Sequence, residues 1–218
     1  MQNIILIAPP AAGKGTQSKL ICEKYQIPHI STGDLLRSAA KEESDMGELI
    51  RKTMESGSLV TDEIVLKLFE ERIKKSDCEN GFVLDGFPRN ISQAESYLEI
   101  LNNQNKPLGI AIYLDVPKEI TRKRIVGRRS CPTCGSVYNV ELDTSLNGLC
   151  NKCGVELIKR ADDTDEIFNE RYKVYENETY PLVDFFKQKD LLTTIGYKES
   201  IEETFAEIEK IINRGNIW

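Results

Sequence analysis

An uninterrupted apolar run near the N-terminus, followed at once by a loop of small residues, most constrains the fold. The run Ile4–Ile7 shows no alternation of apolar and polar positions, so it predicts a strand buried on both faces. The loop after it ends in Gly13-Lys14, where a helix can begin and can direct its free backbone N–H groups at an anion. A strand, a small-residue loop and a helix in this order predict a phosphate-binding loop. The alternative is an ordinary strand–helix turn built from small residues.

Three later segments resemble this first strand and alternate with helical patterns. The strands are expected at 81–85, 110–115 and 191–195. The helices are expected from 14 to about 25, from 61, from Asn90 or Ser92, from 117 to 127, from 164 to about 188, and over 201–212. Buried strands that alternate with helices predict a parallel sheet with helices on both faces.

Two stretches break this alternation, and we interpret them as inserts in one α/β core. Residues 31–61 show helical patterns only, at 34–41 and 44–56, whereas residues 128–160 show little helical periodicity and several turn-forming residues. The core is then expected to comprise 1–30, 62–127 and 161–218.

Charge and hydropathy exclude some classes of protein. The 218 residues carry a net charge of −6, which argues against a protein that mainly coats nucleic acid or an anionic membrane. The stretch 122–160 is the exception, because its eight Lys and Arg outnumber three Asp and Glu. No apolar run is long enough to span a membrane, and the N-terminal run is too short for a signal peptide. We therefore expect a cytoplasmic protein.

Four of the six cysteines form two Cys-x-x-Cys pairs, Cys131/Cys134 and Cys150/Cys153. Fifteen residues separate the pairs, which is a spacing typical of a structural Zn²⁺ site with four thiolate ligands. Each pair is followed by a glycine, where the turn can adopt a left-handed conformation. Disulfides or free thiols are the alternatives. The other two cysteines, Cys22 and Cys78, are expected to be ordinary packed residues.

Arginines near strand ends and insert boundaries are candidates for acting on phosphate. Phosphoryl transfer requires positive charge on oxygens that gain negative charge more than it requires a protein base. Asp85 ends a buried strand and could order Mg²⁺-bound water, cap a helix or form an ion pair. His29 is the only histidine, and we interpret it as structural. The arginines are Arg37, Arg89, Arg124, Arg128, Arg160 and Arg171.

Several short motifs together resemble the adenylate kinase family in order and spacing. They are 11–17, Ser31-Thr32-Gly33-Asp34, Asp85-Gly86-Phe87-Pro88-Arg89, Gly127-Arg128-Arg129, the run 160–163 and the later Arg171. The resemblance covers nearly the whole chain and is to the long bacterial-type form with a zinc-containing lid. It implies a P-loop NTPase-type core, a nucleoside-monophosphate (NMP)-binding insert at 31–61 and a lid at 128–160.

The resemblance also implies the activity: the reversible reaction ATP + AMP ⇌ 2 ADP, with Mg²⁺, by a cytoplasmic monomer that contributes to adenine nucleotide homeostasis. The implied ATP-binding residues are Ala11, Ala12, Gly13, Lys14, Gly15, Thr16, Arg124, Arg128, Val137, Tyr138 and Lys198. The implied AMP-binding residues are Thr32, Arg37, Ser58, Leu59, Val60, Gly86, Phe87, Pro88, Arg89, Gln93, Arg160 and Arg171. The implied catalytic cations are Lys14, Arg89, Arg124, Arg128, Arg160 and Arg171, and Asp85 and Thr16 form the implied magnesium network.

The chain departs from the family pattern at a few positions. Ala8 and Ala11 stand where the loop usually has glycine, Ser58 replaces a commonly basic residue, and Asn139 stands where histidine is frequent. Two other functions remain open at this point. One is a kinase for UMP, CMP or GMP, and the other is a zinc-ribbon module that binds nucleic acid or a protein partner through a loop that is no longer catalytic.

Overall fold

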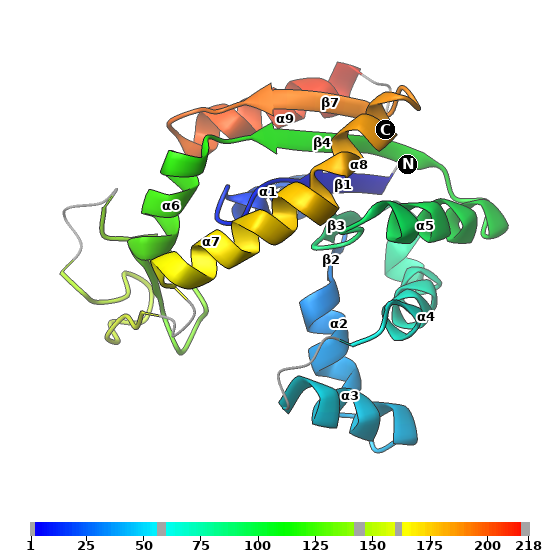
Figure 1. Ribbon diagram of the computed structural model, residues 1–218, viewed down its shortest axis with the longest axis horizontal. Coiled ribbons are helices and arrows are strands. Elements are labelled where there is room, and N and C mark those ends of the chain that lie inside the picture. The colour runs from blue at the N-terminus through cyan, green and yellow to red at the C-terminus, as the bar shows by residue number, and fades with distance from the viewer. Residues whose placement is uncertain (1–2, 56–59, 142–146, 160–162, 215–218) are drawn as a thin grey trace.

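Five parallel strands form the central sheet, in the order β2-β3-β1-β4-β7. The computed structural model describes residues 3–55, 60–141, 147–159 and 163–214. The strands are β1 (Asn3–Ile7), β2 (His29–Ser31), β3 (Val83–Asp85), β4 (Leu108–Asp115) and β7 (Leu192–Gly196). The parallel sheet confirms the fold class predicted from the alternation of buried strands and helices, and Figure 1 shows it at the centre of the molecule.

Each face of the sheet packs on its own set of helices. The helices that cover the sheet are α1 (Lys14–Tyr25), α4 (Asp62–Ile73), α5 (Ile91–Asn103), α8 (Pro181–Lys187) and α9 (Ile201–Arg214). Ile4 and Leu6 of β1 pack with residues of α1 and α9, whereas Ile5 and Ile7 pack with residues of α4, α5 and α8. Because successive side chains of a strand point to opposite faces, this arrangement explains why the run at 4–7 is apolar throughout.

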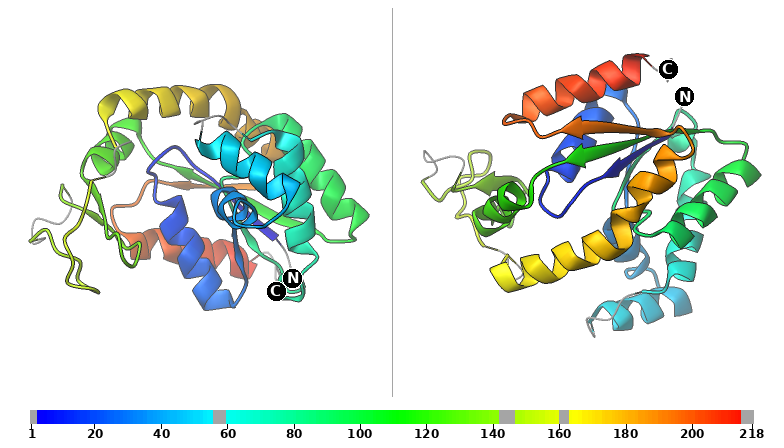
Figure 2. Two further views of the ribbon diagram at one scale, coloured as in Figure 1. Left: turned by 90° about the horizontal axis from the view of Figure 1, so that it is seen from below. Right: turned by 45° about the horizontal axis from the view of Figure 1, so that its top comes forward.

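Two parts of the chain stand away from the sheet in Figures 1 and 2. The first contains α2 (Thr32–Ala39) and α3 (Asp45–Glu55), which follow β2. The second follows α6 (Lys118–Val126) and contains the antiparallel pair β5 (Arg128–Ser130) and β6 (Val137–Asn139). The chain returns to the sheet through α7 (Asp165–Val174), which lies beside α6. Both parts interrupt the alternation of strand and helix.

The strand β2 was not predicted from the sequence. It is only three residues long, and its flanking residues carry no clear strand pattern. Its pairing with β3, in which Ser31 lies opposite Asp85, supplies the hydrogen bonds that make it a strand. A tertiary contact therefore decides this element, as is common for strands.

The long helix expected over 164–188 is continuous but contains one turn of π-helix. This turn, η2 (Tyr175–Thr179), joins α7 to α8, and the Tyr180 N–H donates to the Tyr175 carbonyl five residues earlier, at 2.8 Å. Pro181 follows directly and has no N–H to donate. The π-turn contains one residue more than an α-helical turn. This wider spacing accommodates the missing N–H of Pro181, so the helix continues into α8.

Polar side chains mark the starts of α5 and α7. The Asn90 side chain accepts a hydrogen bond from the Gln93 N–H at 2.9 Å, so α5 begins after Asn90 and not after Ser92. Thr164 caps α7 in the same way, at 3.3 Å from the Ile167 N–H, as predicted. A short 3₁₀ turn, η1 (Ser76–Cys78), follows α4. Among the described helices, none has both the length and the apolar character needed to cross a membrane.

Candidate active site

The loop between β1 and α1 has the geometry of an anion site. Gly13 caps α1 with φ 98°, and Lys14 is the first residue of the helix. The Ala12 N–H donates to the Pro9 carbonyl at 3.2 Å and closes the loop into a turn. The first N–H groups of a helix have no partner within it, and the helix dipole adds positive potential at the same end. The loop thus offers the backbone donors expected of a phosphate site.

Asp85, at the end of β3, holds two basic side chains beside this loop. Its carboxylate lies 3.2 Å from Lys14 Nζ and 3.3 Å from His29 Nε2, each on a different oxygen. Burial alone would raise the pKa of Asp85, but the hydrogen bond from His29 and the charge of Lys14 outweigh it and lower the pKa to about 2. The site therefore keeps a fixed negative charge among its cations.

Arg124 joins the loop to a small pocket on the side of β7. Its Nη1 donates to the Ala12 carbonyl at 2.9 Å, and its guanidinium carbon lies 5.7 Å from the centre of the Tyr197 ring. Arg124 and Ala12 line the pocket together with Tyr197 and Lys198. Its lining combines an aromatic ring, two basic side chains and apolar residues, and its volume of about 10 Å³ has room for one water molecule. Three residues that the family resemblance implied for ATP, at 12, 124 and 198, thus meet here.

A second group of polar residues lies on the other side of Asp85. The Gly86 carbonyl accepts hydrogen bonds from the Thr32 hydroxyl at 3.3 Å and from Arg89 Nε at 2.9 Å. The side-chain amide of Gln93 accepts from the Arg89 N–H at 2.7 Å and donates to Asp62 at 2.6 Å. The hydrogen bonds link four residues that the family resemblance implied for AMP.

The backbone between these residues is anchored in the core. Phe87 is buried and packs against Phe69 and Tyr97, with ring centres 5.4 and 6.1 Å apart. Pro88 is buried and follows Phe87 through a cis peptide bond. The Arg89 side chain, by contrast, is exposed. A rigid backbone therefore presents a charged side chain to solvent.

The other implied AMP residues lie at the edges of this second group. Val60 is partly buried against the core, and Arg37 pairs with Asp34 at 2.6 Å on the exposed side of α2. Arg171 is exposed on α7. Ser58, Leu59 and Arg160 lie outside the described residues.

Arg128 ties together the two ends of the segment that carries the cysteines. Its guanidinium forms two hydrogen bonds with the carboxylate of Asp163, one of which joins Nε to Oδ2 at 2.8 Å. Asp163 is fully buried, so Arg128 supplies the charge that balances it. In this structure the implied phosphate ligand Arg128 is thus engaged within the protein.

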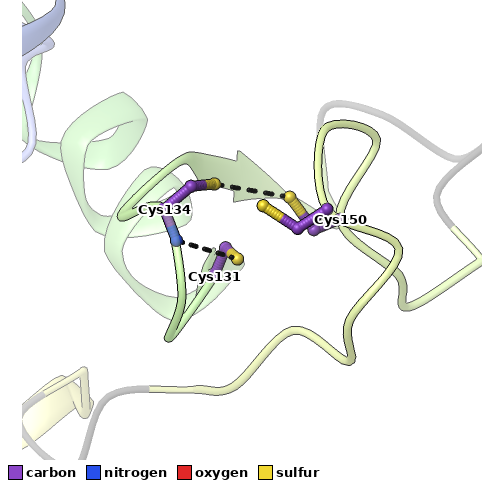
Figure 3. A group of neighbouring side chains, drawn as sticks. Cys131, Cys134 and Cys150 are labelled. Carbon is purple, nitrogen blue, oxygen red and sulfur yellow. Dashed lines mark hydrogen bonds between the residues drawn. The ribbon is translucent and has the colours of Figure 1, made fainter.

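The four paired cysteines converge at the far end of the same segment, and Figure 3 shows Cys131, Cys134 and Cys150 of this cluster. All four sulfur atoms lie within 4.8 Å of one another, and the sulfurs of Cys134 and Cys150 are 3.6 Å apart. Zn–S bonds of 2.3 Å in a tetrahedron require sulfurs about 3.8 Å apart, so the cluster fits a zinc ion. All six cysteines are free thiols, which excludes the disulfide alternative in this structure. Gly135 and Gly154 both adopt φ 68°, the left-handed turn predicted after each pair.

Two residues beside the cysteines hydrogen-bond to their sulfur atoms. The Tyr138 hydroxyl lies 3.3 Å from Cys150 Sγ and accepts from the Asn151 N–H at 3.0 Å. The Ser136 hydroxyl lies 3.2 Å from Cys134 Sγ, and hydrogen bonds with the Ser136 side chain and backbone and with Cys153 lower the pKa of the Cys134 thiol to about 6. The implied ATP residue Tyr138 thus directs its hydroxyl to the cysteine cluster, while its neighbour Val137 is exposed.

The structure also reveals site residues that the sequence did not single out as such. They are His29, Asp62, Asp163, Thr179 and Tyr197. His29 directly precedes the Ile-Ser-Thr-Gly-Asp motif, which was a usable signal for its place at the site. Thr179 donates to the Arg89 carbonyl at 2.9 Å from a position 90 residues away, and no local pattern indicated that contact.

Comparison with known proteins decides between the functions left open above. The family model described as adenylate kinase matches residues 6–191. The adenylate kinase of Clostridium botulinum (strain Loch Maree / Type A3) is 44% identical over 213 residues, which cover 97% of this chain and 99% of that protein. The adenylate kinase of Clostridium perfringens (strain SM101 / Type A) is 43% identical over 211 residues, 96% of this chain and 98% of that protein.

The chain belongs to the adenylate kinase family. Membership confirms the resemblance drawn from the motifs and assigns the chain phosphoryl transfer between ATP and AMP. It does not favour a kinase for another monophosphate or a zinc-ribbon binding module. In this family member, Ala11 of the loop before α1 occupies the left-handed region at φ 61°.

We expect Ala11→Gly to raise kcat/KM for ATP. An L-residue in the left-handed region costs about 1–2 kcal/mol, and glycine removes this strain from a loop whose N–H groups must face phosphate. Steady-state kinetics with varied ATP would measure the effect. Ala12→Gly is the matched control, because Ala12 lies in the same loop without a positive φ and should give no increase. An unchanged or lower kcat/KM for Ala11→Gly would contradict the prediction.

We also expect Asp85→Asn to reduce the loss of stability in acid. Because the pKa of Asp85 is lowered in the folded state, its charge stabilises the fold above pH 4, and this contribution disappears as the pH falls to about 2. The side chain is 18% exposed, and the linked free energy is on the order of 2 kcal/mol. Urea unfolding at several pH values would measure it. Equal pH dependence of the variant and the parent protein would show that the ion pairs of Asp85 do not stabilise the fold.

Proposed function

We propose that the group around Lys14 holds ATP, that the group around Arg89 holds AMP, and that the phosphoryl group passes between them beside Asp85. The observation that carries this proposal is the position of Asp85 and Gly86 at the end of β3. Asp85 contacts Lys14 of the phosphate loop, and Gly86 contacts Thr32 and Arg89 of the second group. Asp85 and Gly86, which are neighbours at the end of β3, therefore contact the Lys14 group and the Arg89 group, respectively. Ligands of open α/β sheets bind at such strand ends.

For ATP, the loop residues 11–16 would receive the phosphates, and Lys14 would add a charge next to them. The adenine would lie beside Arg124 and Lys198, where the small pocket would have to widen, with Val137 and Tyr138 approaching from the cysteine-bearing segment. For AMP, the contacts would come from Thr32, Arg37, the segment 58–60, Gly86–Arg89 and Gln93, with Arg160 and Arg171 near the transferred phosphate.

The chemistry requires no base from the protein. The attacking atom is a phosphate oxygen of AMP, which is already anionic, and the bond that breaks joins the γ-phosphorus of ATP to its bridging oxygen. Lys14 with Arg89, Arg124, Arg128, Arg160 and Arg171 would neutralise the charge on the transferred group and align it. Mg²⁺, when bound, neutralises the charge of the ATP phosphates. The exposed Thr16 would supply an oxygen ligand of the kind that Mg²⁺ prefers, and Asp85 would order Mg²⁺-bound water.

We further propose the division of the chain into a core (1–30, 62–127, 161–218), an NMP-binding insert (31–61) and a lid (128–160). Both inserts would close over the nucleotides and exclude water that would otherwise hydrolyse ATP. Zn²⁺ on Cys131, Cys134, Cys150 and Cys153 would hold the lid together. Among the lid residues that the structure describes, the buried cluster consists of Cys131 and Cys150 with Leu157, which is too little for an apolar core.

The proposed enzyme works as a cytoplasmic monomer on free nucleotides. Both groups of described site residues come from one chain, so no second copy is needed to complete them. Four thiols that hold a metal must stay reduced, which favours the cytoplasm. ATP, AMP and ADP are its partners, with no role for nucleic acid or a membrane.

An assay with ATP, Mg²⁺ and each of AMP, GMP, CMP and UMP tests the proposal, and we expect ADP formation with AMP. Arg128→Ala should lower kcat by orders of magnitude in this assay. It should also destabilise the fold by about 3–5 kcal/mol, because it leaves Asp163 buried and unpaired.

The double variant Arg128→Ala with Asp163→Asn separates the two effects. It removes the buried charge along with its partner, so stability should partly return while kcat stays low. Recovery of kcat with stability would show that Arg128 acts only through Asp163. If metal-loaded protein forms no ADP and does not bind a bisubstrate mimic such as diadenosine pentaphosphate, the proposed function is wrong.

We expect purified protein to contain zinc in a ratio of one per chain and to lose thermal stability when a chelator removes it. Cys153→Ser should abolish stoichiometric zinc and lower the Tm in the same way, because three thiolates leave the site open. Cys22→Ser is the control, since Cys22 lies in α1 outside the cluster. Metal analysis and thermal unfolding on the same samples would test this. Retention of full zinc by Cys153→Ser would contradict it.

A further inference from the structure

We propose that Asp62 determines the preference of the monophosphate site for adenine, by fixing the orientation of the Gln93 side-chain amide. The inference rests on the proposed function, in which Gln93 faces the base of AMP. Asp62 is the first residue of α4, and Gln93 lies in the first turn of α5. The contact between them joins two helices that cover the same face of the sheet.

The amide of Gln93 has one orientation that its partners allow. Its oxygen accepts from the Arg89 N–H at 2.7 Å, and its nitrogen donates to Asp62 Oδ1 at 2.6 Å. A backbone N–H can only donate and a carboxylate can only accept, so the oxygen and nitrogen cannot be exchanged. Gln93 is only 8% exposed, which limits the access of water that could replace either partner.

This orientation leaves one bonding position at each end of the amide. The nitrogen keeps a second N–H, and the oxygen keeps a second lone pair. Adenine offers the complementary pair on its Watson–Crick edge, an acceptor at N1 and a donor at N6. Hypoxanthine, the base of IMP, offers the reverse at the same two positions: a donor at N1 and an acceptor at O6. A fixed amide therefore matches adenine and opposes hypoxanthine.

Accepting hypoxanthine would require the amide to turn over. The oxygen would then face the carboxylate of Asp62, and the NH₂ group would face the Arg89 N–H. Both hydrogen bonds would be lost, and two acceptors and two donors would be left opposed around the buried Gln93 amide, although Asp62 itself is exposed. Because a backbone N–H cannot be changed by substitution, Asp62 is the partner whose chemistry is open to test. Asp62 is a positioning residue in this account, because it acts through Gln93.

Asp62→Asn tests the inference, since an asparagine amide can either accept from the Gln93 nitrogen or donate to its oxygen. The measured quantity is kcat/KM for AMP divided by kcat/KM for IMP, with ATP and Mg²⁺ held constant. We expect this ratio to fall by about tenfold or more, which corresponds to about 1.4 kcal/mol of lost discrimination. A purely structural role for Asp62 would lower both values of kcat/KM and leave the ratio unchanged.

Glu63→Gln is the matched control. Glu63 is exposed and, like Asp62, carries a negative charge in the first turn of α4. Glu63→Gln therefore removes the same charge and reproduces any effect of that loss on the helix dipole. The ratio should stay at the parental value in this variant. Calorimetric binding of AMP and IMP to both variants provides a readout that does not depend on turnover, and Asp62→Ser replaces Asp62→Asn if the latter does not fold.

The possible outcomes separate the two proposals. A fall of the AMP to IMP ratio in the Asp62 variant, with no change in the Glu63 variant, supports the inference. An unchanged ratio in the Asp62 variant, or an equal fall in both variants, overturns it and leaves the proposed function in place. Failure of the parent protein to phosphorylate AMP overturns the proposed function, and the inference falls with it.

Discussion

The parallel pairing of β2, β3 and β1 determines which groups meet at the site. Asp85 at the end of β3 lies opposite Leu6 in β1 and Ser31 in β2. The chain leaves all three strands at one edge of the sheet, so the phosphate loop, the segment from Gly86 and the start of α2 lie next to one another. A shift of one residue in this register would turn the Asp85 side chain to the opposite face. The contacts to Lys14 and His29 would then be lost together.

The features predicted correctly from the sequence are those that depend on local pattern. The buried strand at 4–7, the helix from Lys14 and the two cysteine knuckles each follow from residues close together in the chain, and all are present. Ala11 stands where the family resemblance implies glycine, and it adopts φ 61°, a left-handed value that glycine reaches without strain. In each case the physical cause is short in range: burial of a strand, a helix start, or a turn that needs a left-handed residue.

The features that were missed depend on contacts between distant parts of the chain. β2 exists because β3 offers an edge, and His29 reaches the site only because β2 is a strand. Thr179, the last residue of the π-turn, donates to the Arg89 carbonyl 90 residues away. The pairing of Arg128 with Asp163 likewise joins residues that are far apart in the sequence. Local periodicity cannot report such contacts, although it can identify the residues that take part.

The site combines fixed backbones with exposed cations. The Arg89 main chain is held on both sides, by Gln93 at its N–H and by Thr179 at its carbonyl, while its side chain remains exposed. Arg37 and Arg171 are likewise exposed on regular helices. Fixing the backbone in advance removes part of the entropy that binding would otherwise cost. Side chains in water still bind phosphate, yet they release it more readily than buried ones. ATP and AMP together carry the same charge as two ADP, so cations that bind the substrates bind the products about as well. Exposed cations suit such an enzyme, because they bind phosphate weakly enough for the products to leave.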